Sequence, residues 1–284
     1  MKTATQVLEA FDSIRRGQRA GTYSPHKPLL IMLALARVQR GDQRLVAFAE
    51  IEELLKQLLI EFGPSSAAKS RHYPFWHLAT DGRGALWDLN GPRQILERSA
   101  GVTPTLGELR EHHIKAGFPP EIDEALRHVP GLLEAVASRI LNTYFPDTLH
   151  ADIVAALGMN LDGIRELRDS ATTADDYIAT ARRKRDPGFR DRVLRAYEFR
   201  CCVCGFDLRI GHTPAGLEAA HIKWHHVGGP DIEPNGLSLC ALHHKLFDLG
   251  AFTVEPSERR VVFSQLAISG ARGTTGELQF HGHP

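Results

Sequence analysis

Clustered cysteines and histidines are the most chemically specific feature of the chain. All four cysteines lie within residues 200–250, together with six of the fifteen histidines. Two close pairs of thiolate or imidazole ligands can supply the tetrahedron that structural zinc prefers. Scattered cysteines that are merely buried would not gather in this way. The spacing therefore predicts a zinc site, with two residues between the members of each pair: Cys201 with Cys204, and Cys240 with His243.

Three further residues lie beside these pairs. His221 ends the expected strand LEAAH, and Asn235 follows in a loop. His244 comes directly after the last predicted zinc ligand, His243, and both lie in residues 237–250, which are expected to form one helix. Adjacent helix residues point about 100° apart. His244 should therefore face away from the zinc and toward the strand that carries His221. A neutral imidazole, with a reference pKa of about 6.5, can take a proton from water near neutral pH.

The blocks LEAAHI, NGLSLC and HHKLFDLG closely resemble the HNH (ββα-metal) nucleases of the McrA-like branch. The resemblance implies a structural zinc and a separate catalytic cation, Mg²⁺ or Mn²⁺. It implies that His221 is the general base, that Asn235 fixes the loop and orients His221, and that His244 binds the catalytic cation. Many relatives carry aspartate where this chain has Ala220. Glu218 and Asp248 are candidates for the cation ligand that the missing aspartate would have supplied. The other local histidines are interpreted as loop or surface groups: His212, His225 and His226. Cys202 is interpreted as a small buried residue.

The first half of the chain is predicted to be mainly helical. Apolar residues recur at helical spacing in residues 3–16 and 47–62, and a nearly all-apolar helix is expected from Ser24, as N-cap, to Gly41. Residues 73–90 look like two short strands around a turn, a winged-helix-like arrangement, with Phe75, Trp76 and Trp87 in the core. Further helices are expected at 104–118, 120–129, 130–146 and 149–158. The predicted fold class is α+β, and a closing strand pair is expected after residue 250.

Two motifs of this first half, SPHKPLLIMLALARV and GPSSAAKSRHYPFWHL, resemble the sulfur-binding domains of phosphorothioate-dependent type IV restriction endonucleases. Such domains recognise DNA in which sulfur replaces a non-bridging phosphate oxygen. Sulfur is larger and less strongly hydrated than oxygen, so its pocket should be shallow and apolar with a cation nearby. The resemblance implies an apolar wall from Tyr73 and Pro74, a charged rim from His26 and Lys27, His77 in the pocket, and Arg71 and His72 on phosphate or a base edge.

Composition limits the possible partners without selecting one. The chain has 34 basic and 34 acidic residues, so any affinity for nucleic acid must come from local patches. The run 182–185 is such a patch and is expected to contact phosphate. No secretory signal or membrane-spanning run is expected, which favours the cytoplasm, where clustered thiols hold metal rather than form disulfides. The expected domains are 1–157 for DNA recognition, 158–185 as a helical connector and 186–284 for the HNH nuclease.

The leading hypothesis is a modification-dependent restriction endonuclease that binds phosphorothioated double-stranded DNA and cuts nearby. One alternative keeps the nuclease but has the first domain read another modified base or an unmodified sequence. Another is a zinc-stabilised DNA-binding protein whose nuclease site has decayed, which Ala220 would allow. With one HNH centre per chain, cutting both strands needs a homodimer or sequential nicking, and both remain open.

Overall fold

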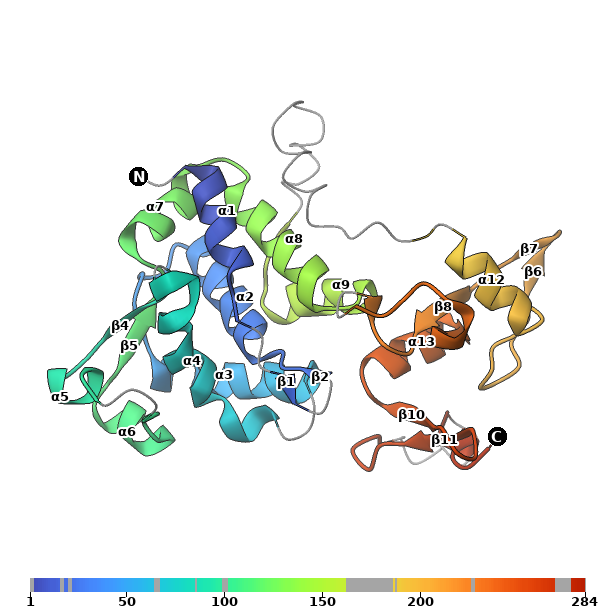
Figure 1. Cartoon of the computed structure of the whole chain (residues 1–284). Helices are drawn as coiled ribbons and strands as arrows, with labels where there is room; N and C mark the ends of the chain where they lie inside the picture. The colour runs from blue at the N-terminus through green and yellow to red at the C-terminus, as the bar shows by residue number, and fades with distance from the viewer. Residues whose placement is uncertain are drawn as a thin grey trace. The chain divides into compact units, whose positions relative to one another are not determined.

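The chain forms two compact units, Met1–Phe145 with His150–Arg182 and Pro146–Leu149 with Arg183–Pro284 (Figure 1). No helix in the part of the chain described here is long and apolar enough to cross a membrane. The predicted connector from residue 162 onward and the basic run 182–185 lie outside the described residues. This computed structural model describes residues 3–15, 18–19, 22–63, 67–84, 86–98, 102–161, 186, 188–225, 228–268 and 277–283.

Helix α2, His26–Gln39, is the centre of the first unit. Its buried residues run without a break from Pro28 to Ala36, which confirms the prediction of a central helix that is apolar on nearly every side. Four helices pack against it: α3 (Phe48–Glu61), α4 (His72–His77), α7 (Pro120–His128) and α8 (Leu132–Tyr144). The described part of this unit also contains α1 (Ala4–Asp12), β1 (Gln18–Arg19), β2 (Thr22–Tyr23), η1 (Ala67–Ser70), α5 (Arg93–Leu96) and α6 (Leu106–Glu111). Helix α9 (Asp147–Ala156) belongs to it from His150 onward.

A three-stranded antiparallel sheet replaces the predicted hairpin. Its order is β3 (Val46–Ala47), β5 (Lys115–Gly117), β4 (Asp88–Asn90), so the central strand comes last in sequence. The first half of the predicted hairpin is helical, as α4 and the 3₁₀ segment η2 (Leu78–Gly84). The helix expected at 104–118 likewise ends at Glu111, and its second half is β5. These predictions were wrong because the strands pair across long stretches of sequence, which local patterns do not reveal.

Aromatic rings join the helices to this sheet. Phe48 meets Phe75 edge to face at 5.1 Å between centroids, and Trp87 lies between Phe75 and Phe118 at 6.3 and 5.5 Å. The Trp87 indole Nε1 donates to the Phe75 carbonyl at 3.0 Å, so its one polar group is satisfied in the core. Phe75 and Trp87 are buried as predicted, whereas Trp76 is only partly buried.

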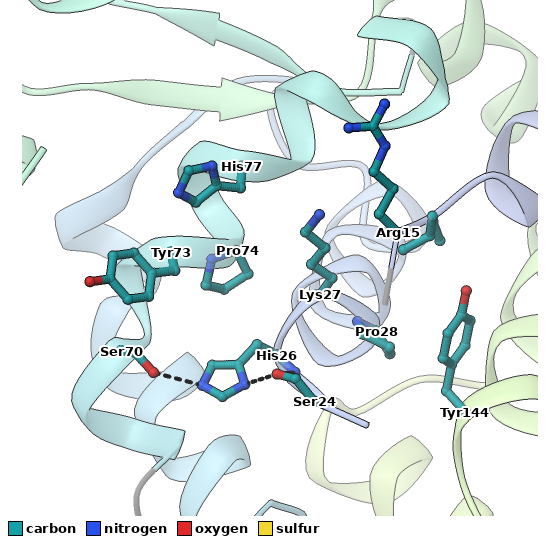
Figure 2. Close-up of a pocket in the computed structure, with 11 residues that line it drawn as sticks. Arg15, Ser24, His26, Lys27, Pro28, Ser70, Tyr73, Pro74, His77 and Tyr144 are labelled. Atoms are coloured by element: carbon teal, nitrogen blue, oxygen red, sulfur yellow. Dashed lines mark hydrogen bonds between the residues drawn. The ribbon is translucent and has the colours of Figure 1, made fainter. Parts of the chain in front are cut away.

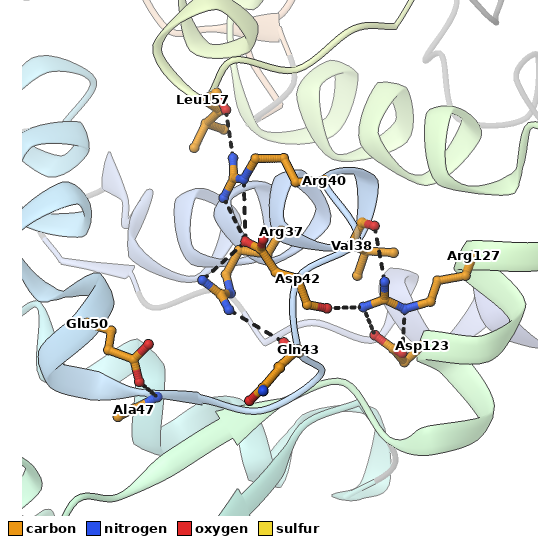
Figure 3. Close-up of polar contacts among 10 residues, drawn as sticks. All are labelled: Arg37, Val38, Arg40, Asp42, Gln43, Ala47, Glu50, Asp123, Arg127 and Leu157. Atoms are coloured by element: carbon orange, nitrogen blue, oxygen red, sulfur yellow. Dashed lines mark hydrogen bonds and ion pairs between the residues drawn. The ribbon is translucent and has the colours of Figure 1, made fainter.

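An arginine in α7 ties that helix to the turn that follows α2 (Figure 3). Arg127 Nε and Nη2 donate to the two Asp123 carboxylate oxygens at 2.8 and 3.2 Å. Nη2 also donates to the Asp42 carbonyl at 2.7 Å, and Nη1 to the Val38 carbonyl at 3.4 Å. The Asp123 side chain is 12% exposed, and among the described residues Arg127 is the one cation that pairs with its charge.

We expect Arg127→Ala to lower the free energy of unfolding of the first unit by about 3 kcal/mol, because it leaves the buried Asp123 carboxylate and the Asp42 carbonyl without their donor. The matched control is Arg93→Ala, which breaks the solvent-exposed pair with Glu97 and should cost less than about 0.5 kcal/mol. Chemical denaturation followed by circular dichroism measures both. Equal free energies of unfolding for the two variants would contradict the stabilising role assigned to Arg127.

The second unit contains a ββα arrangement preceded by helix α12 (Phe189–Ala196). Strand β8 (Leu217–His221) pairs antiparallel with β9 (Gly236–Cys240), with His221 opposite Gly236, and α13 (Ala241–Asp248) follows directly. The single helix predicted over 237–250 was wrong in its first half, which is β9. No alternation of polar and apolar residues marked Gly236–Cys240 as a strand, because all five residues are buried. Further hairpins are β6 (Arg209–Ile210) with β7 (Thr213–Pro214), and the predicted closing pair β10 (Phe252–Glu255) with β11 (Arg260–Phe263).

Candidate functional site

The predicted zinc ligands form one cluster. Ligand atoms of Cys201, Cys204, Cys240 and His243 all lie within 4.8 Å of one another. The His243 Nδ1 atom faces the thiols, at 3.1 Å from the Cys240 Sγ and 3.6 Å from the Cys201 Sγ. Cys240 is the N-cap residue of α13 and His243 lies in its first turn, so the helix start holds this pair on one side. Three thiols and one imidazole are a donor set typical of structural zinc.

The thiols differ in their readiness to ionise. Burial raises the pKa of Cys204 to about 12, whereas hydrogen bonds from His243 and from nearby backbone amides overcome burial and lower the pKa of Cys201 to about 6. Burial also raises the pKa of Cys202 to about 12, and this residue is not part of the cluster. Its main-chain N–H donates to the Ser238 carbonyl, and its side chain is only partly buried, whereas a buried residue was predicted.

His221 ends strand β8 and has a partner that the sequence did not indicate. Its Nε2 lies 2.7 Å from the Asp231 Oδ1, and its ring stacks on Phe189 with 4.2 Å between centroids and 20° between planes. His225, predicted to be a loop or surface group, is only 11% exposed and approaches the Asp231 Oδ2 at 3.7 Å. His225 therefore lies in the loop between β8 and β9, as predicted, but its side chain is not a surface group. Of the other two, His212 is exposed and His226 lies outside the described residues.

Asn235 fixes the loop, but its contacts are to the backbone. Its Oδ1 accepts from the Lys223 N–H at 2.9 Å, and its Nδ2 donates to the carbonyls of Lys223 and Pro230, each at 3.0 Å. The amide side chain thus joins the two ends of the loop between β8 and β9. The contact with the His221 ring comes from Asp231 instead.

His244 faces strand β8, as helix geometry predicted. Its Nδ1 lies 2.5 Å from the Glu218 Oε2, and its Nε2 lies 3.3 Å from the Asp248 Oδ2. Glu218 is partly exposed, with 45% of its side chain accessible, whereas Asp248 is buried, which raises the pKa of its carboxyl. One imidazole therefore lies between an accessible carboxylate and a buried one. Because the two carboxylates lie at opposite nitrogens of the ring, the imidazole can share a divalent cation with only one of them.

A pocket of about 370 Å³ opens in the first unit, beside the start of α2. It gathers five of the seven residues predicted to bind DNA. Its position follows from two helices, because α2 starts at His26 and α4 presents an exposed tyrosine ring next to it. Figure 2 shows Tyr73, Pro74 and His77 on one side of this pocket, Arg15 and Tyr144 on the other, and His26, Lys27 and Pro28 between them.

The charge in this pocket is partly compensated. The Lys27 Nζ contacts both carboxylate oxygens of Asp81, at 2.7 and 2.9 Å, and Asp81 is fully buried. The backbone N–H of Arg15 donates to the same carboxylate at 3.2 Å, which places this residue at the pocket edge. No carboxylate in the described part of the chain contacts the Arg15 guanidinium. Arg15 therefore offers the uncompensated positive charge, and no sequence pattern had indicated it.

The two pocket histidines are neutral near pH 7. Burial lowers the pKa of His26 and, together with the charge of Lys27, the pKa of His77. The His26 Nε2 lies 2.8 Å from the Ala67 carbonyl, and its Nδ1 contacts the Ser24 hydroxyl. Ser24 therefore holds the ring, while Pro25 occupies the N-cap position that was predicted for Ser24.

Arg71 and His72 do not line the pocket. The Arg71 guanidinium donates to the Glu52 carboxylate at 2.6 and 2.9 Å and to the Ala68 carbonyl at 2.9 Å. Arg110 binds the same carboxylate, and its hydrogen bond, with that of Arg71, lowers the pKa of Glu52 despite partial burial. The His72 ring lies 4.4 Å from the Tyr73 ring and supports it from outside the pocket.

Comparison with known proteins identifies both units. Residues 4–162 match the family described as ScoMcrA-like, DNA sulfur-binding domain, and residues 201–255 match the HNH endonuclease family. Comparison with curated proteins gives no match. The predicted combination of a sulfur-binding domain with an HNH endonuclease domain is confirmed, and with it the fold class: a mostly helical first region with small antiparallel sheets, and an HNH domain after it. This is the domain composition of a modification-dependent DNA endonuclease.

Solved structures resemble the chain at low identity. The sulfur-binding domain of ScoMcrA complexed with phosphorothioated DNA has 23% identity and a TM-score of 0.47, covering 59% of this chain and 99% of that one. The corresponding domain of SprMcrA, also complexed with phosphorothioated DNA, has 22% identity and a TM-score of 0.46, covering 57% and 97%.

The type IV phosphorothioation-dependent restriction endonuclease ScoMcrA has 21% identity and a TM-score of 0.43 over 69% of this chain, which spans a third of its length. The family assignment itself rests on the match over residues 4–162, which is more than half of the 284 residues. By that match, the chain belongs to the ScoMcrA-like DNA sulfur-binding domain family and carries an HNH endonuclease domain behind it.

Proposed function

We propose that this protein binds duplex DNA containing a phosphorothioate and hydrolyses phosphodiester bonds near it. The observation that carries the proposal is the pocket at the start of α2, where Tyr73 and Pro74 offer apolar surface beside Lys27 and Arg15. A phosphorothioate needs both features, because its sulfur is poorly hydrated and its charge remains. The match of residues 4–162 to the ScoMcrA-like DNA sulfur-binding domain family adds support.

Sulfur selection in this pocket would depend on the tyrosine ring. Tyr73 is 48% exposed, which is open for a residue with a large ring, and contact with sulfur would remove apolar surface from water. Because the Asp81 carboxylate compensates the charge of Lys27, the lysine would orient the bound phosphorothioate more than it would add net positive charge. Arg15 would meet the anionic oxygen or a neighbouring phosphate. Arg71, which pairs with Glu52, would act by holding α4 in place.

In the nuclease centre, His221 would take a proton from the attacking water. Asn235 would keep the loop in the shape that presents the histidine, through its bonds to Lys223 and Pro230. The reaction breaks an O–H bond of water and the P–O bond to the leaving oxygen, so a base is needed on one side and positive charge on the other.

His244 and Glu218 are the residues that would hold the catalytic Mg²⁺ or Mn²⁺. Their 2.5 Å contact brings an imidazole nitrogen and a carboxylate oxygen together where Ala220 offers no ligand. If the Nδ1 binds the cation, the Nε2–H can donate to Asp248, an arrangement in which a carboxylate orients a metal-binding histidine. A bound cation would supply charge stabilisation at the scissile phosphate. Double-strand cleavage would require two chains or two successive nicks.

The Tyr73→Ala variant tests the proposed recognition. We expect its preference for a phosphorothioated duplex over the same plain duplex to fall by about 10-fold or more, since removing a ring from an apolar contact costs roughly 1.5–3 kcal/mol. Affinity for the plain duplex should stay nearly unchanged. Tyr73→Phe, which keeps the ring, is the matched control and should retain the preference. Gel-shift titrations with the two duplexes give both numbers. A Tyr73→Ala protein that still prefers sulfur would rule out this pocket.

A further inference from the structure

The His221 ring is held from two directions. Its Nε2 lies 2.7 Å from the Asp231 Oδ1, and the Phe189 ring stacks on its face at 4.2 Å. The side chains of His221 and Asp231 are only 12% and 13% exposed, so water competes weakly for this hydrogen bond. The stacking fixes the plane of the ring and the hydrogen bond at Nε2 fixes its rotation within that plane. The other ring nitrogen, Nδ1, therefore points in one defined direction.

Asp231 is itself held in place before any substrate arrives. Its Oδ2 accepts from the Asp186 N–H at 2.7 Å, and its main-chain carbonyl accepts from the Arg192 guanidinium at 2.8 Å. The loop reaches this position through two glycines. Gly228 has φ +85°, and a Cβ at Gly229 would lie 1.7 Å from the Lys223 carbonyl oxygen. This close approach folds the loop back on itself, which brings the Asp231 carboxylate to the end of β8.

The hydrogen-bonding capacity of a carboxylate decides which ring nitrogen carries the proton. Although burial favours the neutral acid, hydrogen bonds from the Asp186 N–H and from His221 lower the pKa of Asp231, so it is ionised near neutral pH. An ionised carboxylate can only accept. The His221 Nε2 therefore carries the hydrogen, and the lone pair of the neutral ring is on Nδ1.

We infer that Asp231 is the positioning residue of the nuclease centre, fixing the tautomer and orientation in which His221 accepts a proton from water. The inference rests on the proposed nuclease function and deepens it. The proton leaves the water oxygen for the His221 Nδ1, and that oxygen bonds to phosphorus as the P–O bond to the leaving oxygen breaks. The imidazolium that forms faces the negative charge of Asp231. The His225 Nε2 lies 3.7 Å from the other oxygen of this carboxylate, with its ring 5.6 Å from that of His221.

The Asp231→Asn variant tests this role. We expect kcat for nicking phosphorothioated supercoiled plasmid with Mn²⁺ to fall on the order of 10- to 100-fold, with KM within about twofold, since the change affects proton transfer and not binding. Asp191→Asn is the matched control, because this exposed aspartate of α12 pairs only with Arg195 among the described residues. It should keep the wild-type kcat.

Nitrogen NMR of the full chain with labelled histidine gives a second readout, which a purely structural role would not move. With His221 assigned by its loss in His221→Ala, the wild type should show the Nε2–H tautomer and Asp231→Asn a mixture of both. A wild-type Nδ1–H tautomer, or an Asp231→Asn protein with wild-type kcat, would overturn the inference about Asp231 and leave the proposed function standing. A wild-type chain that cuts no substrate would overturn the proposed function, and this inference with it.

Discussion

Replacement of His221 by alanine should lower the rate of DNA cleavage on the order of 1,000-fold while leaving DNA binding unchanged. The variant removes the base at the end of β8 but keeps the strand, since alanine fits a position opposite Gly236 in the β8–β9 pair. The pocket that would bind the phosphorothioate lies in the other unit, so affinity for the modified duplex should stay at the wild-type value. Single-turnover cleavage and gel-shift titration of the same preparation measure the two effects.

The matched control for this experiment is His212→Ala. His212 is an exposed histidine in the turn between β6 and β7, so the same side chain is removed from a position without a role in the proposed chemistry. It should cut at the wild-type rate. If His221→Ala kept more than a tenth of the wild-type activity, His221 could not be the general base.

Loss of one zinc ligand should unfold the second unit and leave the first one folded. Metal binding contributes about 10–16 kcal/mol in small zinc domains, which is as large as the whole stability of a typical domain, about 5–15 kcal/mol. We therefore expect Cys240→Ser to lose zinc and the thermal transition of the nuclease unit. The first unit, which has its own core around α2, should keep its transition.

Cys202→Ser is the matched control, because it removes a neighbouring thiol that lies outside the cluster. It should retain one zinc per chain by elemental analysis and both thermal transitions. Zinc retained by Cys240→Ser, or lost by Cys202→Ser, would show that the ligand set is different.

The elements that could be predicted are those whose information is local. Helix α2 was predictable because its apolar residues follow one another without a break, and the zinc cluster because each ligand pair lies within one turn. The sheet of β3, β5 and β4 was not, because β5 inserts between strands that precede it in sequence. Its short, half-buried strands have no alternation of their own that would separate them from a helix end.

The site was predictable in its residue types but not in its partnerships. His221, Asn235 and His244 were indicated by their motifs, whereas Asp231 reaches His221 only because a glycine turn folds the loop back. Arg15 likewise reaches the pocket through its backbone bond to Asp81, a residue far away in sequence. A carboxylate that arrives through tertiary folding gives no signal in the spacing of the chain.

Sulfur-dependent cleavage is tested by digestion of two matched duplexes that differ by one sulfur atom. Both carry the same sequence, one has a single phosphorothioate, and both are incubated with the full chain and Mn²⁺. We expect the modified duplex to be cut at least about 10-fold faster at low enzyme concentration, since sulfur contact raises affinity for that duplex alone. Equal cleavage of both duplexes would contradict it, and would leave an HNH nuclease whose first unit reads something other than sulfur.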